Sequence, residues 1–131
     1  MYLHVDHNSG VPISAQLIDQ IKYLVVSGRL EPGEQIPSVR ALAADLKLNP
    51  TTVARVYQQL EAEEIIYTQH GRGTFIARRR SALTATEKRE RVRSDIRALV
   101  VECARIGMDY EEMIKLIRQE IEGIQRKGGG S

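Results

Sequence analysis

Apolar side chains recur at helical spacing between residues 12 and 27, with polar side chains in between. The apolar positions are Ile13, Leu17, Ile21, Leu24 and Val25. Because residues three and four apart share one face of a helix, this pattern predicts a first amphipathic helix. Pro12 is suited to the start of that helix, and Gly28 to its end.

Two short helices with a brief connection are predicted next. Ser38 is placed to cap a helix that extends to about Leu46, and Asn49 followed by Pro50 favours the start of another that ends near Glu63. The inner face of this later helix is apolar and consists of Val53, Val56, Tyr57 and Leu60. Its outer face is polar and consists of Thr51, Thr52, Arg55, Gln58 and Gln59. Such a pair is typical of a helix-turn-helix.

The pattern of apolar residues then changes from one typical of helices to one typical of strands. Residues 65–69 and 74–78 are rich in β-branched and aromatic side chains, and residues 70–73, His-Gly-Arg-Gly, separate them. A glycine-bearing segment of this length between two such runs predicts a hairpin. A helix-turn-helix followed by a hairpin is a winged helix-turn-helix.

Two longer amphipathic helices are predicted in the C-terminal third. Thr84 and Glu87 have capping-box spacing and open a helix to about Ile106; Gly107 ends it, and Asp109 caps the next. Apolar residues follow steps of four and three along both helices, and we call these positions the apolar seams. The seams consist of Val92, Ile96, Leu99, Cys103 and Ile106, and of Tyr110, Ile114, Ile117, Ile121 and Ile124.

These elements together predict a mainly α protein with a small β wing. A winged helix-turn-helix is expected over residues 10–78, with a polar boundary at 78–81. A helical hairpin over residues 82–127 follows, and residues 128–131 are expected to be a flexible tail. One hairpin cannot cover both of its own apolar seams, so the hairpin is predicted to mediate dimerisation, and a response to an effector would also reside there.

Charge is distributed unevenly along the chain, although the net charge is only +2. Residues 67–97 contain nine Lys and Arg against three Asp and Glu, whereas the flanking segments are mildly acidic. Concentrated positive charge favours a polyanionic partner, and a solvated helix face is the alternative. Lys88, Arg89, Arg91 and Arg93 fit either interpretation.

Composition excludes several other classes. Hydrophobic residues make up 42% and charged residues 27%, as in folded globular proteins. No apolar run approaches the roughly 18 residues of a membrane span, and the N-terminus does not look like a signal peptide. A single cysteine excludes an intramolecular disulfide and fits a cytoplasmic location. His4, His7 and Asp6 could bind a metal, but the preferred interpretation is a mobile N-terminal segment without metal.

Three separated motifs resemble the GntR family of bacterial transcription regulators. They are Pro-Gly-Glu-Gln-Ile-Pro-Ser-Val-Arg at 32–40, Asn-Pro-Thr-Thr-Val-Ala-Arg-Val-Tyr at 49–57, and Gly-Arg-Gly-Thr-Phe-Ile at 71–76. The form of the second motif and the short two-helix C-terminal segment are similar to the YtrA-type subfamily. The resemblance implies a homodimeric regulator, usually a repressor, that binds double-stranded operator DNA, with or without a small-molecule effector. Relatives often have Gly where this chain has Glu64, so a left-handed backbone there would be strained.

The resemblance also implies a set of DNA contacts. The set is Ser38, Arg40, Asn49, Thr51, Thr52, Arg55, Gln59, His70, Gly71, Arg72, Gly73 and Thr74. Helix N-termini suit phosphates, and a guanidinium can pair bidentately with guanine or clamp a phosphate. Pro50 stands where some relatives have a base-reading arginine, so direct readout is expected from Asn49, Arg55 and Gln59. Arg72 in the wing suits a narrow minor groove.

Each functional interpretation has an alternative. Arg55 could form an exposed ion pair with Glu61 or Asp45, and the wing tip could make no contact at all. Cys103 in the apolar seam is expected to be a core residue. No catalytic constellation or cofactor motif stands out, so an enzyme with a phosphate site at Gly71–Gly73 is disfavoured. A winged-helix module that binds another protein remains the main rival.

Overall fold

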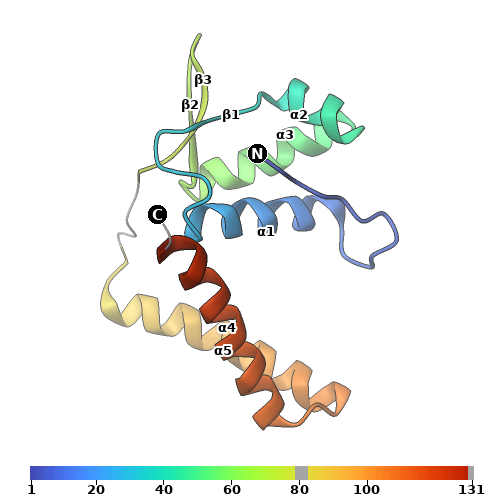
Figure 1. Cartoon of the computed structure of the whole chain (residues 1–131), viewed down its shortest axis with the longest axis vertical. Helices are drawn as coiled ribbons and strands as arrows, with labels where there is room; N and C mark the ends of the chain where they lie inside the picture. Colours follow the sequence, from blue (N-terminus) through green and yellow to red (C-terminus); the bar gives the residue numbers. More distant parts are fainter. Residues whose placement is uncertain (79–82, 130–131) are drawn as a thin grey trace. The chain divides into compact units, whose positions relative to one another are not determined.

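The computed structural model describes residues 1–78 and 83–129, which form two compact units (Figure 1). The first unit contains α1 (Ile13–Val26), β1 (Gln35–Ile36), α2 (Val39–Leu46), α3 (Pro50–Ala62), β2 (Ile66–Gln69) and β3 (Gly73–Ile76). The second contains α4 (Ala85–Ile106) and α5 (Tyr110–Gly129) as far as Gln125. Within these described residues, five helices and a small sheet confirm the predicted mainly α fold with a β wing. The predicted boundary at 78–81 lies largely outside the described residues.

Side-chain caps determine where the two short helices begin. The Oγ of Ser38 accepts a hydrogen bond from the backbone N–H of Ala41 at 3.1 Å. The Oδ1 of Asn49 accepts one from the N–H of Thr51 at 2.8 Å, and Pro50 occupies the first turn of α3. Each cap satisfies one of the N–H groups that a helix start leaves without a partner. Both predicted helix starts are confirmed.

The end of α3 carries a strained residue at the position singled out from the sequence. Glu64 has φ 61°, the left-handed conformation in which glycine is usual. Its N–H donates to the carbonyl of Glu61, and the N–H of Ile65 donates to the carbonyl of Leu60, both at 2.9 Å. These two bonds form a Schellman motif, which turns the chain from α3 toward β2.

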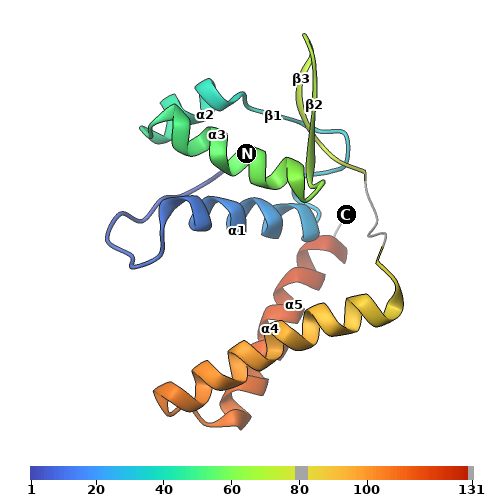
Figure 2. The ribbon, with the colours of Figure 1, turned by 180° about the vertical axis from the view of Figure 1, so that it is seen from behind.

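The three strands form an antiparallel sheet in the order β1-β3-β2. Phe75, in the central strand β3, lies opposite Gln35 of β1 on one side and opposite Tyr67 of β2 on the other. The hairpin β2–β3 was predicted, but β1 was not. In Figure 1 and, from behind, Figure 2, the hairpin projects from the helices as a wing. β1 pairs with β3 and is followed closely by Ser38, which caps α2. The hydrogen bonds between β1 and β3 therefore join the wing to the helix-turn-helix.

One hydrophobic core holds the first unit together. Its largest completely buried side chains are Leu17, Ile21, Leu42, Val53, Val56, Leu60, Ile66 and Ile76. They come from all three helices and two strands, and they include three of the four predicted inner positions of α3. The fourth, Tyr57, is also buried, with 6% of its surface exposed. The predicted inner face of α3 is therefore confirmed.

The N-terminal segment is bound to α1, which corrects the expectation of a mobile segment. The side-chain amide of Gln20 accepts from the N–H of His4 and donates to its carbonyl. Gln16 makes the equivalent pair of hydrogen bonds with the backbone of Asp6. Met1, Leu3 and Val5 of this segment pack against the core. Among the residues that the structure describes, no cluster of His, Cys, Asp and Glu could hold a metal.

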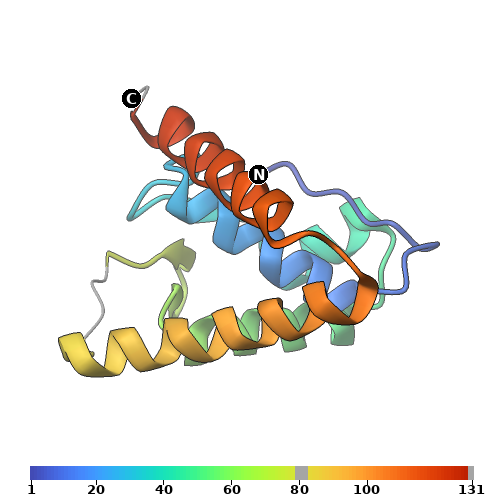
Figure 3. The same cartoon turned by 90° about the horizontal axis from the view of Figure 1, so that it is seen from below.

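The second unit is an open pair of helices. α4 begins with the predicted capping box, because Thr84 and Glu87 exchange hydrogen bonds between side chain and backbone at 3.1 Å. Gly107, with φ 77°, ends it. Figure 3 shows α4 and α5 diverging from the turn that joins them. The sequence predicted a tail from residue 128, but α5 continues to Gly129, and residues 130–131 lie outside the described part.

The apolar seams of α4 and α5 are largely uncovered within the chain. Ile96, with 51% of its surface exposed, and Ile117, with 38%, illustrate this. Ile124 is half-buried, and Cys103 is buried at 3%, because it packs beside the turn and its thiol donates to the carbonyl of Met108 at 3.2 Å. Within the described residues, no helix is long and apolar enough to cross a membrane.

Candidate nucleic-acid interface

The outer face of α3 presents polar side chains to solvent. Thr51, Arg55 and Gln59 are four residues apart and exposed, whereas Thr52 is half-buried. The apolar inner face holds the helix against α1 and α2, so this exposed row has a fixed direction. A helix that is anchored on one face and polar on the other can lie in the major groove of duplex DNA.

The starts of α2 and α3 combine helix N-termini with hydrogen-bond donors that are still available. Capping occupies the acceptor oxygens of Ser38 and Asn49, while the Ser38 hydroxyl proton and the Asn49 amide NH₂ can still donate. Arg40 is exposed in the first turn of α2. A cation there opposes the helix dipole, and a bound phosphate would relieve that conflict. Both helix starts are therefore suited to phosphate.

Arg55 and Gln59 differ in how they are held. The Gln59 Nε2 donates to the carboxylate of Glu63 at 2.8 Å, and the other oxygen of that carboxylate accepts from Lys22 at 2.8 Å. Gln59 is thus tied to the end of α3. In the part of the chain that the structure describes, Arg55 forms no ion pair with Glu61 or Asp45. The guanidinium of Arg55 is therefore free to meet a ligand.

A buried tyrosine connects α3 to the segment that precedes α2. The Tyr57 hydroxyl donates to the carbonyl of Pro37 at 2.6 Å, one residue before the Ser38 cap. Burial raises the pKa of this phenol to about 12. The bond holds the second half of α3 against the segment that leads into α2, so it helps to keep the two helices in one arrangement.

The wing tip exposes His70, Gly71 and Arg72 between β2 and β3. Its turn is closed by the Arg72 N–H, which donates to the carbonyl of Gln69 at 3.0 Å. Gly73 and Thr74 are half-buried, and Tyr67 stacks on Phe75 with their ring centroids 5.5 Å apart. The structure thus places Arg72 at the exposed tip of a hairpin stiffened by a cross-strand aromatic pair.

The sequence analysis missed Gln35, which supports the wing from β1. Its Nε2 donates to the carbonyl of Arg72 at 3.1 Å. Gly73 has φ 128°, and the Gln35 side chain occupies the space that a Cβ on Gly73 would need. Little in the sequence indicated this role, because Gln35 is a single polar residue in a strand of two residues.

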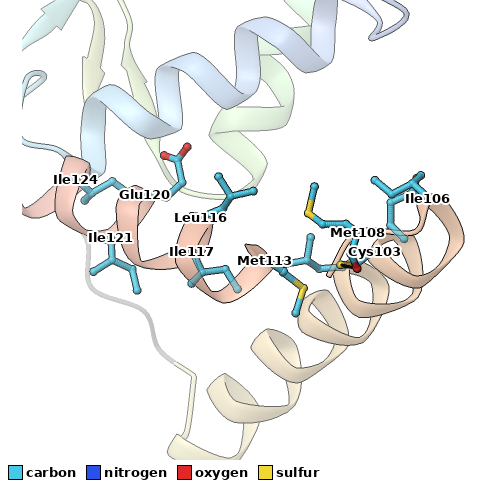
Figure 4. Close-up of a pocket in the computed structure, with 11 residues that line it drawn as sticks. Cys103, Ile106, Met108, Met113, Leu116, Ile117, Glu120, Ile121 and Ile124 are labelled. Carbon is cyan, nitrogen blue, oxygen red and sulfur yellow. Dashed lines mark hydrogen bonds between the residues drawn. The ribbon is translucent and has the colours of Figure 1, made fainter. Parts of the chain in front are cut away.

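The second unit contains an apolar pocket between its two helices. The pocket has a volume of about 420 Å³. Figure 4 shows its lining residues from α4, the turn and α5. They are Leu99, Glu102, Cys103, Ile106, Met108, Met113, Leu116, Ile117, Glu120, Ile121 and Ile124. Six of the ten residues of the apolar seams line it, and the other four, Val92, Ile96, Tyr110 and Ile114, are exposed elsewhere on the seams.

Comparison with known proteins identifies the family. Residues 13–76 match the family described as "Bacterial regulatory proteins, gntR family". The chain is 35% identical over 124 residues to the HTH-type transcriptional repressor YtrA of Bacillus subtilis (strain 168), covering 92% of this chain and 95% of that one. The chain belongs to the GntR family. It is a DNA-binding transcriptional regulator of the YtrA-like type, with a winged helix-turn-helix.

Solved structures of relatives have the same architecture as this GntR-family protein. A transcriptional antiterminator from Listeria monocytogenes EGD-e superposes with a TM-score of 0.83 at 34% identity, covering 95% of this chain and 92% of that chain. YtrA from Sulfolobus acidocaldarius, a GntR-family transcription factor, superposes with a TM-score of 0.55 at 27% identity, covering 94% and 99%. The similarity extends over both units, so the two C-terminal helices are shared with these relatives.

Proposed function

We propose that this GntR-family protein is a cytoplasmic, homodimeric repressor that binds a near-palindromic operator. The observation that carries the proposal is the presence of two exposed surfaces in one chain. One is the polar outer face of α3 with the wing tip, and the other is the uncovered apolar surface of α4 and α5. The first fits duplex DNA and the second fits another copy of the same chain. The similarity to the repressor YtrA supports the direction of regulation.

On the DNA surface, α3 enters the major groove and Arg55 contacts a base. Arg40 and the N-termini of α2 and α3 contact phosphates and set the orientation of the helix. Arg72 reaches the neighbouring minor groove from the wing tip. Asn49 contributes through its free amide donors, whereas Gln59 contributes less because its amide is bonded to Glu63.

On the dimer surface, the apolar seams of two copies cover one another. Large apolar side chains exposed over two whole helices are unusual for a monomer, because leaving them in water forgoes about 25 cal/mol for each Å². A four-helix bundle formed from two open helix pairs would bury them. Its two-fold axis would present two copies of α3, so the operator half-sites should be one helical turn apart, about 34–36 Å, or a multiple of it.

Selection of genomic fragments followed by retardation assays tests this function. Purified full-length protein should enrich a common near-palindromic sequence and bind it at least about a hundredfold more tightly than a shuffled duplex at moderate salt. A duplex with one half-site inverted serves as the matched control and should bind weakly. Equal affinity for operator and shuffled DNA would contradict sequence-specific regulation and favour a protein-binding module.

A further inference from the structure

We propose that Gln35 is a positioning residue for the wing, which fixes Arg72 in the orientation that DNA binding requires. The proposal rests on the proposed DNA-binding function and adds a residue that lies outside the helices and the hairpin. Gln35 belongs to β1, next to β3, and its side chain reaches the backbone where the wing tip enters β3. Its Nε2 donates to the backbone carbonyl of Arg72 at 3.1 Å.

The Gln35 side chain also lies against Gly73, the residue after Arg72. Gly73 adopts φ 128°, which side-chain-bearing residues rarely adopt, and Gln35 packs where a Cβ would lie. The Gln35 amide therefore bonds the Arg72 carbonyl and fills the space beside the next residue, Gly73. Since the Arg72 N–H also donates to Gln69, this peptide segment is held on two sides.

The position of Gln35 links the wing to the helix-turn-helix. Ile36, the next residue, is buried in the core, and Ser38 caps α2 two residues later. Gln35 is itself exposed, so its polar end contributes little to the core. Its amide therefore connects the Arg72 backbone with the strand that leads to Arg40.

Fixing the wing before binding increases affinity, because a mobile tip would lose conformational entropy when it enters the groove. A lone net hydrogen bond changes an equilibrium by about twofold to tenfold. Gln35→Met keeps the length of the side chain and removes the donor. We expect it to weaken operator binding by about threefold to tenfold. Gln119→Met, at an exposed position in α5, is the matched control and should bind as the wild type does.

The decisive comparison is a double-mutant cycle in the full-length protein. Operator affinity is measured by fluorescence anisotropy for wild type, Gln35→Met, Arg72→Ala and the double variant. If Gln35 acts through Arg72, the Gln35→Met change has little effect once Arg72 is alanine. A purely structural role would weaken both backgrounds equally. Backbone order at Gly71, Arg72 and Gly73, measured by ¹⁵N relaxation without DNA, should fall in Gln35→Met.

The outcomes separate the two proposals. A wild-type protein that does not prefer operator DNA would overturn the proposed function and, with it, the role of Gln35. Specific binding by the wild type, together with unchanged affinity in Gln35→Met, would overturn the role of Gln35 alone. Equal losses in both backgrounds, or an equally ordered wing tip in Gln35→Met, would overturn it as well.

Discussion

The side chain of Gln59 donates to the carboxylate of Glu63 one turn further along α3, with 2.8 Å between Nε2 and the oxygen. This hydrogen bond makes Gln59 less available for DNA contact than the other exposed residues on the outer face of α3. One amide N–H of Gln59 is engaged by Glu63, which holds its side chain toward the end of α3, whereas within the described residues Arg55, one turn earlier, makes no such bond. The sequence placed both residues on one face, and the structure distinguishes them.

Arg55→Ala is therefore expected to cost more than Gln59→Ala. A bidentate contact between Arg55 and guanine would make the loss about 1–3 kcal/mol on the operator. That loss should be concentrated at one base position, as measured by titrating a set of single-substitution operators. On the unsubstituted operator, Gln59→Ala should cost less than Arg55→Ala. Equal weakening by Arg55→Ala on all sequences would assign Arg55 to the phosphate backbone instead.

Arg40→Ala should change the salt dependence of binding. A cation that neutralises one phosphate contributes about 0.9 to the slope of log K against log salt. The variant should therefore show a slope smaller by about one, with similar losses on operator and random DNA. Lys115→Ala, on the exposed surface of α5, is a charge-matched control and should leave the slope unchanged. An unaltered slope in Arg40→Ala would show that Arg40 contacts no phosphate.

Glu64 allows a direct measurement of backbone strain. Glu64→Gly and Glu64→Ala both remove the carboxylate, so they lose the same side-chain interactions. They differ because glycine adopts the left-handed conformation of residue 64 without strain. Denaturant unfolding should show Glu64→Gly more stable than Glu64→Ala by about 1 kcal/mol. If alanine were equal or better, the left-handed conformation would not be costly at this position.

Stability should decrease in strong base because of Tyr57. Its pKa rises from about 10 in the unfolded chain to about 12 in the folded protein. The neutral phenol is favoured by folding, so this contribution is complete below pH 10 and is lost as the pH rises toward 12. Tyr57→Phe should be less stable than the wild type at pH 8, because it loses the bond to Pro37. The difference in unfolding free energy should shrink between pH 10 and 12, and a constant difference would contradict this linkage.

Local chemistry explains which parts of the fold could be predicted from the sequence. Ser38, Asn49 and Thr84 cap their helices through bonds to residues two or three positions away, so a short motif contains the whole interaction. β1 could not be predicted this way. It is two residues long and pairs with a strand about forty positions further along, so its formation depends on the folded wing.

At the candidate site, too, local features could be predicted from the sequence, whereas contacts between distant residues could not. The sequence placed Arg40, Arg55 and Arg72 at exposed positions, and the structure agrees. It could not show that Gln35 supports Arg72, because that contact joins residues that are distant in the sequence. Likewise, the attachment of the N-terminal segment depends on two glutamine side chains of α1 that reach its backbone.

The size of the protein in solution, measured by multi-angle light scattering with and without operator DNA, tests the central claim most directly. The account predicts a dimer at micromolar concentration and two chains on each operator. Ile117→Asp, which would bury an unpaired charge in the apolar surface, should give a folded monomer that has lost tight operator binding. Lys115→Asp, two residues away, should remain dimeric. A wild-type monomer that binds the operator as a single chain would contradict the account.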